Sequence, residues 1–118
     1  MQNLFRFIKK YNYVFVFLLL DDGIIAMAEQ LEDAAMAQKI TMQAYYGKRD
    51  FNKMIELSAA ALEVQTTDEG RSDIYYLLGV AYNEKEQFDA AIAAMKNVTA
   101  GANVENAKAV IAALTPAE

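Results

Sequence analysis

The sequence repeats itself once, and this repeat constrains the fold more than any other feature. Five residues of the first copy recur 37 positions later in the second. They are Ala44, Tyr45, Lys48, Phe51 and Ile55, matched by Ala81, Tyr82, Lys85, Phe88 and Ile92. The spacing is that of two helices joined by a turn, a unit that buries its apolar face only by stacking on a copy. The repeat therefore predicts an all-α fold of stacked antiparallel helical hairpins.

The composition agrees with a helical fold. The chain has 118 residues, the length of a single domain, with 55% hydrophobic residues, 1 proline and 5 glycines. Good helix formers dominate after residue 24, and β-branched residues do not alternate with polar ones over the length of a strand. We therefore expect no β-sheet.

Apolar periodicity predicts five helices after the N-terminal segment. They span residues 24–46, 51–64, 72–85, 88–99 and 104–114. We expect a turn at Gly47 and Lys48, and an exposed loop at residues 65–70, the most polar and least periodic stretch. The last helix is expected to close the stack before Pro116.

Residues that favour helix ends flank several of these segments. Asp21 or Asp22 precedes the first helix, Asp50 the second and Asn103 the fifth, and each can accept hydrogen bonds from free amides of the first turn. Gly101 is suited to the left-handed conformation that ends the fourth helix. These residues predict where the helices begin and end.

The N-terminal segment, residues 1–22, differs from the body, residues 23–118. Arg6, Lys9 and Lys10 come before an apolar run at residues 13–20, which would span about 12 Å as a helix. A bilayer core requires about 20 apolar residues, so we expect no transmembrane helix. Three interpretations stay open: a signal peptide cleaved after Ala28, a membrane-surface helix, and an apolar helix packed on the body.

The first 20 residues, MQNLFRFIKKYNYVFVFLLL, also resemble the start of bacterial rod-shape-determining cell-wall proteins. In that family the membrane anchor continues apolar well beyond this length. Here the match ends at Leu20, where two aspartates follow. The resemblance implies membrane association through residues 1–20.

Composition excludes several function classes. The chain has neither cysteine nor histidine, so it lacks thiolate and imidazole metal ligands and the commonest catalytic base. Residues 21–118 hold all 16 acidic side chains and 8 of the 11 basic ones, a net charge of −8. Such a body repels a phosphate backbone, so we expect no nucleic-acid partner.

The second copy resembles the tetratricopeptide repeat family. Its motif residues are Tyr75, Leu78, Gly79, Tyr82, Ala91 and Met95. The first copy departs from the family pattern at Met42, Met54 and Ser58, and Asn103 replaces the family proline. The resemblance covers about residues 35–114, and implies a short solenoid with repeats at about 35–68 and 72–105. Small residues at Gly79 and Ala91 would let the two helices of a hairpin approach closely.

The resemblance also implies a concave groove that binds a peptide or helix of a protein partner. Its positions in this chain are Met36, Lys39, Gln43, Tyr46, Asp73, Tyr76, Leu77, Val80 and Asn83. Members that clamp a terminal carboxylate use Lys and Asn at such positions of successive repeats. Only Lys39 and Gln43 are similar to that set, so the resemblance disfavours a carboxylate clamp.

We expect a binding module with no cofactor and no enzymatic activity. The acidic clusters are Glu29, Glu32, Asp33 and Asp68, Glu69, Asp73, and we interpret both as solvated surface. The glycines are scattered, so no phosphate-binding loop is predicted. Two other functions stay open: a membrane-associated or exported assembly factor, and a self-associating structural protein. The compartment, whether cytoplasm, membrane or periplasm, stays open with them.

Overall fold

A computed structural model describes residues 33–117, and this part of the chain is helical without any strand. The helices are α3 (Ala34–Gly47), α4 (Phe51–Glu63), α5 (Asp68–Glu84), α6 (Phe88–Met95) and α7 (Val104–Leu114). The all-α prediction is thus confirmed for these residues. The signal-peptide, membrane-surface and N-terminal helix interpretations fall on residues 1–32, outside the described part.

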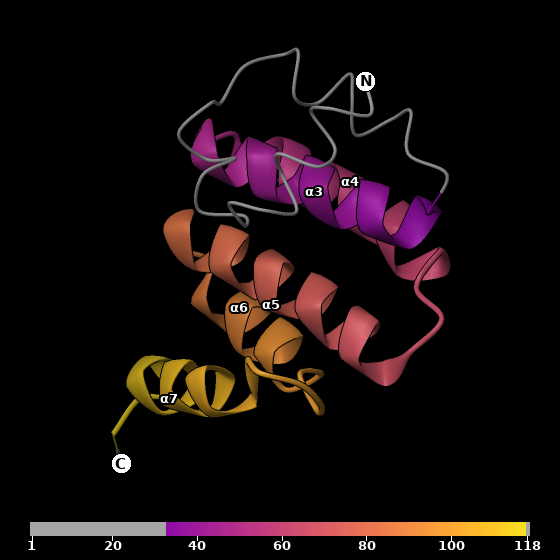
Figure 1. Ribbon diagram of the computed structural model, residues 1–118. Coiled ribbons are helices and arrows are strands. Elements are labelled where there is room, and N and C mark those ends of the chain that lie inside the picture. The colour runs from indigo at the N-terminus through magenta and orange to yellow at the C-terminus, as the bar shows by residue number, and fades with distance from the viewer. Residues whose placement is uncertain (1–32, 118) are drawn as a thin grey trace.

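The helices are arranged as two consecutive pairs followed by a single helix (Figure 1). α3 packs on α4, α5 packs on α6, and α7 packs on α6. The two pairs meet because α5 contacts both α3 and α4. α3 and α5, the first helices of their pairs, therefore lie next to each other.

The turns within the two pairs have the same geometry. Arg49 and Glu86, 37 residues apart, are left-handed with φ of 58° and 61°. The Arg49 amide donates to Tyr46 O and the Glu86 amide to Asn83 O, both at 2.9 Å. A turn was predicted at Gly47 and Lys48, and the chain does turn directly after Gly47, the last residue of α3. The sequence repeat is thus also a repeat of backbone conformation.

Side-chain caps fix the starts of α3 and α4. Asp50 Oδ1 accepts from the Lys53 amide at 3.1 Å, which confirms the predicted start of α4. The first helix was predicted to run without a break from residue 24 to residue 46, but it is interrupted at Asp33, and its predicted part at residues 24–32 lies outside the described residues. Asp33, in an extended conformation, accepts from the Met36 amide at 3.1 Å, so α3 begins at Ala34. Asp21 and Asp22, the caps we expected, lie among residues 1–32.

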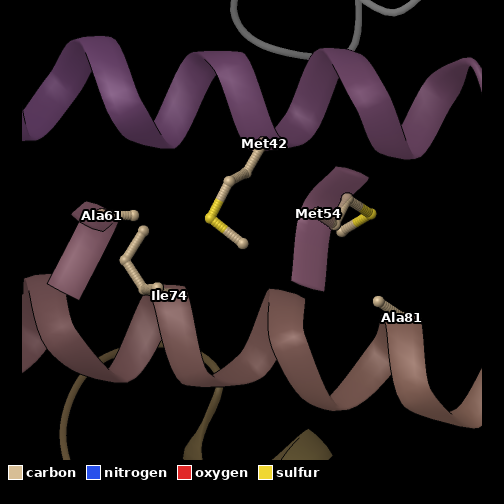
Figure 2. Packing of buried hydrophobic residues seen from close by; sticks show 5 residues of the cluster. All are labelled: Met42, Met54, Ala61, Ile74 and Ala81. Atoms are coloured by element: carbon tan, nitrogen blue, oxygen red, sulfur yellow. The ribbon is translucent and has the colours of Figure 1, made fainter. Parts of the chain in front are cut away.

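The main core cluster spans three helices and so joins the two pairs. It consists of Met42 from α3, Met54 and Ala61 from α4, and Ile74 and Ala81 from α5, all fully buried (Figure 2). Burial of each large apolar side chain contributes about 1.5–3 kcal/mol. Residues of both copies therefore share this cluster, and it belongs to neither pair alone.

A second cluster lies beneath α7. Met95, Val98 and Ala107 form it, and all three are buried. A Cβ built on Gly79 would lie 2.8 Å from Met95 Cε and 3.0 Å from Met95 Cγ. Ala91, one turn before Met95, is fully buried. The predicted close approach of α5 and α6 at Gly79 is therefore present.

The predicted exposed loop at residues 65–70 is right only in part: residues 66–69 are exposed and residues 65–67 are non-helical, but the first and last residues are buried and α5 already begins at residue 68. Gln65 is only 6% exposed, and its Nε2 donates to Ala35 O at 3.0 Å. Thr67 caps α5 by accepting from the Gly70 amide at 2.9 Å, so the helix starts at Asp68 instead of Ser72. Acidic residues in the first turn interact favourably with the helix dipole. The polar stretch thus consists of a buried anchor, two exposed loop residues and the first turn of a helix.

The fourth helix ends earlier than predicted. α6 stops at Met95 instead of residue 99, and the amides of Thr99 and Ala100 donate to the hydroxyl of Ser72 at 3.1 and 3.2 Å. Ser72 is 1% exposed, so these bonds hold the chain against α5 and away from the axis of α6. Gly101 has the predicted positive φ, 90°, but six residues beyond the end of α6.

Candidate partner-binding groove

A cavity of about 430 Å³ lies between α3, α5 and the start of α7. Its lining in the described part of the chain is Lys39, Gln43, Tyr46, Asp73, Tyr76, Leu77, Val80 and Asn103. We call this cavity the groove. Three of its residues come from α3, four from α5, and Asn103 is the residue before α7.

Helical periodicity brings these residues to one side. On both α3 and α5, most neighbouring groove residues are three or four positions apart. This is the spacing of one helix face, so each set of residues lies on one side of its helix. Other faces of the same helices supply Met42 and Ile74 to the core. The core therefore fixes the rotation of α3 and α5, and this rotation turns the remaining side chains toward the groove.

The polar end of the groove is a connected set of three side chains. Lys39 Nζ lies 2.7 Å from Asp73 Oδ2, and the two side chains are 23% and 29% exposed. Asn103 Nδ2 donates to the other carboxylate oxygen, Asp73 Oδ1, at 3.1 Å. Asp73 thus joins α3 and the start of α7 to α5, with both oxygens engaged.

The apolar part of the groove rests on the two core clusters. Leu77 packs against the cluster around Met42, while Tyr76 and Val80 pack against the cluster around Met95. Tyr46 is more open, with 37% of its surface exposed, and its ring lies 6.2 Å from that of Phe51. Because Leu77, Tyr76 and Val80 pack against the core clusters, the apolar surface of the groove is formed without a ligand.

Gln43 lies between the polar and apolar parts on α3. Its Oε1 is buried and accepts no hydrogen bond from the residues that the structure describes. A buried amide oxygen without a donor costs about 1–3 kcal/mol. The groove therefore contains one acceptor whose hydrogen-bonding capacity is unused.

Seven of the nine groove residues predicted from the resemblance line this cavity, and two do not. Met36 lies in the first turn of α3, where its amide bonds to Asp33. Asn83 lies in the last turn of α5, where its carbonyl accepts from the Glu86 amide. Both stand at helix ends, beyond the stretch where α3 and α5 face the cavity.

Asn103 is the groove residue that sequence reasoning missed. It was predicted to cap α7, and it does occupy the position before that helix, but its side chain makes no capping bond. The side chain bonds to Asp73 instead, 30 residues upstream. In the sequence, the only unusual feature of this position is an asparagine where the tetratricopeptide pattern has proline. That difference does not show that the side chain bonds to Asp73.

The second acidic cluster, which lies in the described part of the chain, is divided between the surface and the groove, while two of the three residues of the first cluster lie outside that part. Asp68 pairs with Arg71 Nη2 at 2.7 Å on the surface, while Asp73 faces the groove. Within residues 33–117 no group of three or more acidic side chains could hold a metal ion. No helix in that range has the length and apolar character to cross a bilayer.

Comparison with known proteins leaves the groove as the main guide to function. No family model matches the chain, and neither a curated protein nor a solved structure matches it. Indications of function therefore come from the residues of the groove and from the helices that position them.

Proposed function

We propose that this protein is a tetratricopeptide-like interaction module that binds a peptide or helix of a partner protein in the groove. One observation carries the proposal. Residues selected from the two copies by the family resemblance, which lie far apart in the sequence, line one cavity. They include three from α3 and four from α5.

Three features support stacking of the tetratricopeptide kind. The turns at Arg49 and Glu86 have equal geometry, so the two pairs are built alike. Gly79 allows α6 to approach α5 where the family places its glycine. α7 covers α6 with Ala107 inward and polar residues such as Glu105 and Lys108 outward, as a terminal capping helix does.

The chemistry of the groove fits a polypeptide ligand. Two tyrosines, a leucine and a valine supply apolar contact area, and tyrosine is enriched at protein interfaces. The volume of about 430 Å³ accommodates a few side chains, and the two charged residues among the described lining, Lys39 and Asp73, are bonded to each other. We therefore propose binding without catalysis.

A peptide-display selection with the full-length chain tests this function. Selected peptides are synthesised, and their affinities for the wild type and for groove variants are measured by fluorescence anisotropy. Tyr46→Ala removes a partly exposed ring, and Val80→Asp places a charge in the apolar part. We expect each to weaken binding about tenfold or more, because central aromatic and apolar contacts dominate interface energy.

The control variant is Ala60→Asp, which adds the same charge on an exposed position of α4 outside the groove. It should bind like the wild type. Circular dichroism and the urea midpoint show whether each variant is folded. If Val80→Asp does not fold, Tyr46→Ala alone tests the groove. Peptides that bind all three variants with wild-type affinity would contradict the groove as the binding site.

A further inference from the structure

The Lys39–Asp73 ion pair occupies the part of the groove where a charged ligand group would bind. Lys39 Nζ is 2.7 Å from Asp73 Oδ2, and Asp73 Oδ1 accepts from Asn103 at 3.1 Å. Both charged side chains are more than two thirds buried, so their interaction is screened less than that of a surface pair. The charge of each is thereby compensated within the protein.

This pairing determines how the groove responds to charge on a ligand. A ligand carboxylate that approaches Lys39 also meets the negative charge of Asp73. A ligand cation would have to replace Lys39 as the partner of Asp73. The other described lining residues, Gln43, Tyr46, Tyr76, Leu77, Val80 and Asn103, are uncharged. Desolvation of either kind of ligand charge in the groove would therefore be left uncompensated.

We infer that the groove recognises an uncharged apolar segment from the interior of a partner chain, and that Asp73 excludes free carboxyl ends by holding Lys39. This inference rests on the proposed function and names its ligand class. An interior segment brings no terminal charge into the groove, and its apolar side chains can contact Tyr46, Tyr76 and Val80. Its main-chain amides also match the unused acceptor Gln43 Oε1.

Asp73→Asn is the variant that isolates this role. Asparagine keeps the shape of the side chain and retains an oxygen that can accept from Asn103 Nδ2. The substitution removes the negative charge beside Lys39, so the partly buried ammonium group becomes available to a ligand carboxylate. A matched control is Asp68→Asn, which removes an exposed carboxylate from the same helix, outside the groove.

Two display libraries of the same random design test the inference with the full-length chain. In one, each peptide ends in a free carboxylate; in the other, it continues into a linker. Binders from both are synthesised as carboxylate and amide forms, and their dissociation constants are measured for the wild type, Asp73→Asn and Asp68→Asn. Sensitivity to Tyr46→Ala shows which peptides occupy the groove.

We expect the wild type and Asp68→Asn to select linker-joined peptides and to bind amides about tenfold more tightly than carboxylates. Asp73→Asn should reverse this order and bind carboxylates about tenfold more tightly than amides.

The inference would be overturned if the wild type and Asp73→Asn showed the same ratio of carboxylate to amide affinity. In that case the proposed function would still stand, provided that Tyr46→Ala weakens binding of the selected peptides. If neither library yields a groove-dependent binder, the proposed function fails first. A synthetic peptide of residues 1–22 that outcompetes every selected peptide would overturn the assignment to a partner chain.

Discussion

At the scale of single residues, Gly79 shows how one missing side chain determines the distance between two helices. Met95 fills the space that a Cβ would occupy, with its Sδ 3.0 Å from that position. Met95 is itself 1% exposed, so it has little free space into which it could move. The contact between α5 and α6 therefore depends on glycine at this position.

Gly79→Ala is expected to destabilise the protein although alanine is the better helix former. Helix propensity favours alanine by about 1 kcal/mol, whereas overpacking costs about 1–3 kcal/mol. We expect a net loss of about 1 kcal/mol in the free energy of unfolding, measured by urea denaturation. In a Met95→Ala background the overpacking disappears, and Gly79→Ala should then stabilise. The same sign in both backgrounds would show that Met95 is not the obstacle.

At the scale of helices, the starts of α4 and α5 show which boundaries sequence reveals. Asp50 stands directly before a periodic apolar segment, and its capping role was predicted correctly. Thr67 caps α5 in the same way, but it lies in a polar stretch that looks like a loop. Local sequence could not show that Gln65 anchors this stretch to Ala35, 30 residues away.

Thr67→Ala is expected to weaken the start of α5. Loss of an N-cap hydroxyl costs about 1 kcal/mol, so the urea midpoint should fall correspondingly. The Gly70 amide, which donates to Thr67 Oγ1 at 2.9 Å, should also exchange its hydrogen faster, as measured by NMR. The control is Thr66→Ala, an exposed neighbour that makes no cap. Equal effects of the two substitutions would argue against the cap.

The end of α6 was not predictable for a related reason. Apolar periodicity continues to Val98, and nothing in residues 96–99 breaks a helix by itself. The helix stops because Ser72, on another helix, accepts from two amides of the following segment. Of the described helix starts with a side-chain cap, only that of α4 was recognised in the sequence, and the end of α6, which a distant side chain sets, was not.

At the scale of the whole molecule, the core cluster of Met42, Met54, Ala61, Ile74 and Ala81 links the two helix pairs. Residues from both copies contribute to it, so the first pair cannot unfold without exposing apolar surface of the second. Small domains that share one core usually unfold in a single transition. We therefore expect the two pairs to unfold together.

Ile74→Ala tests this coupling. Ile74 is fully buried, and its truncation should cost about 2–5 kcal/mol. If the pairs are coupled, amide signals of α4 and α6 should disappear at one common, lowered urea concentration in NMR spectra. Ala60→Ser, on the exposed side of α4, should leave the midpoint nearly unchanged. Separate midpoints for α4 and α6 would contradict a shared core.

Most of the residues that line the groove were predicted from the tetratricopeptide resemblance, which marks positions on the first helix of each pair. Once α3 and α5 are aligned as first helices of their pairs, residues such as Lys39 and Asp73 must face the same side. The Lys39–Asp73 bond and the contribution of Asn103 were not predictable, because they depend on how side chains from separate segments meet. These unpredicted contacts are the ones that the proposed ligand preference depends on.

The matching turns have a consequence for how such a chain can change in length. Residue 50 has φ −96° and ψ 76°, and residue 87 has φ −93° and ψ 75°, so the backbone is in the same state at both points. A tandem duplication of residues 51–87 would join Gln87 to a second Phe51 across a boundary that the protein already contains in nearly identical form. The chain could therefore be lengthened by two helices at a time. The backbone at the new connection would have a conformation that the protein already uses.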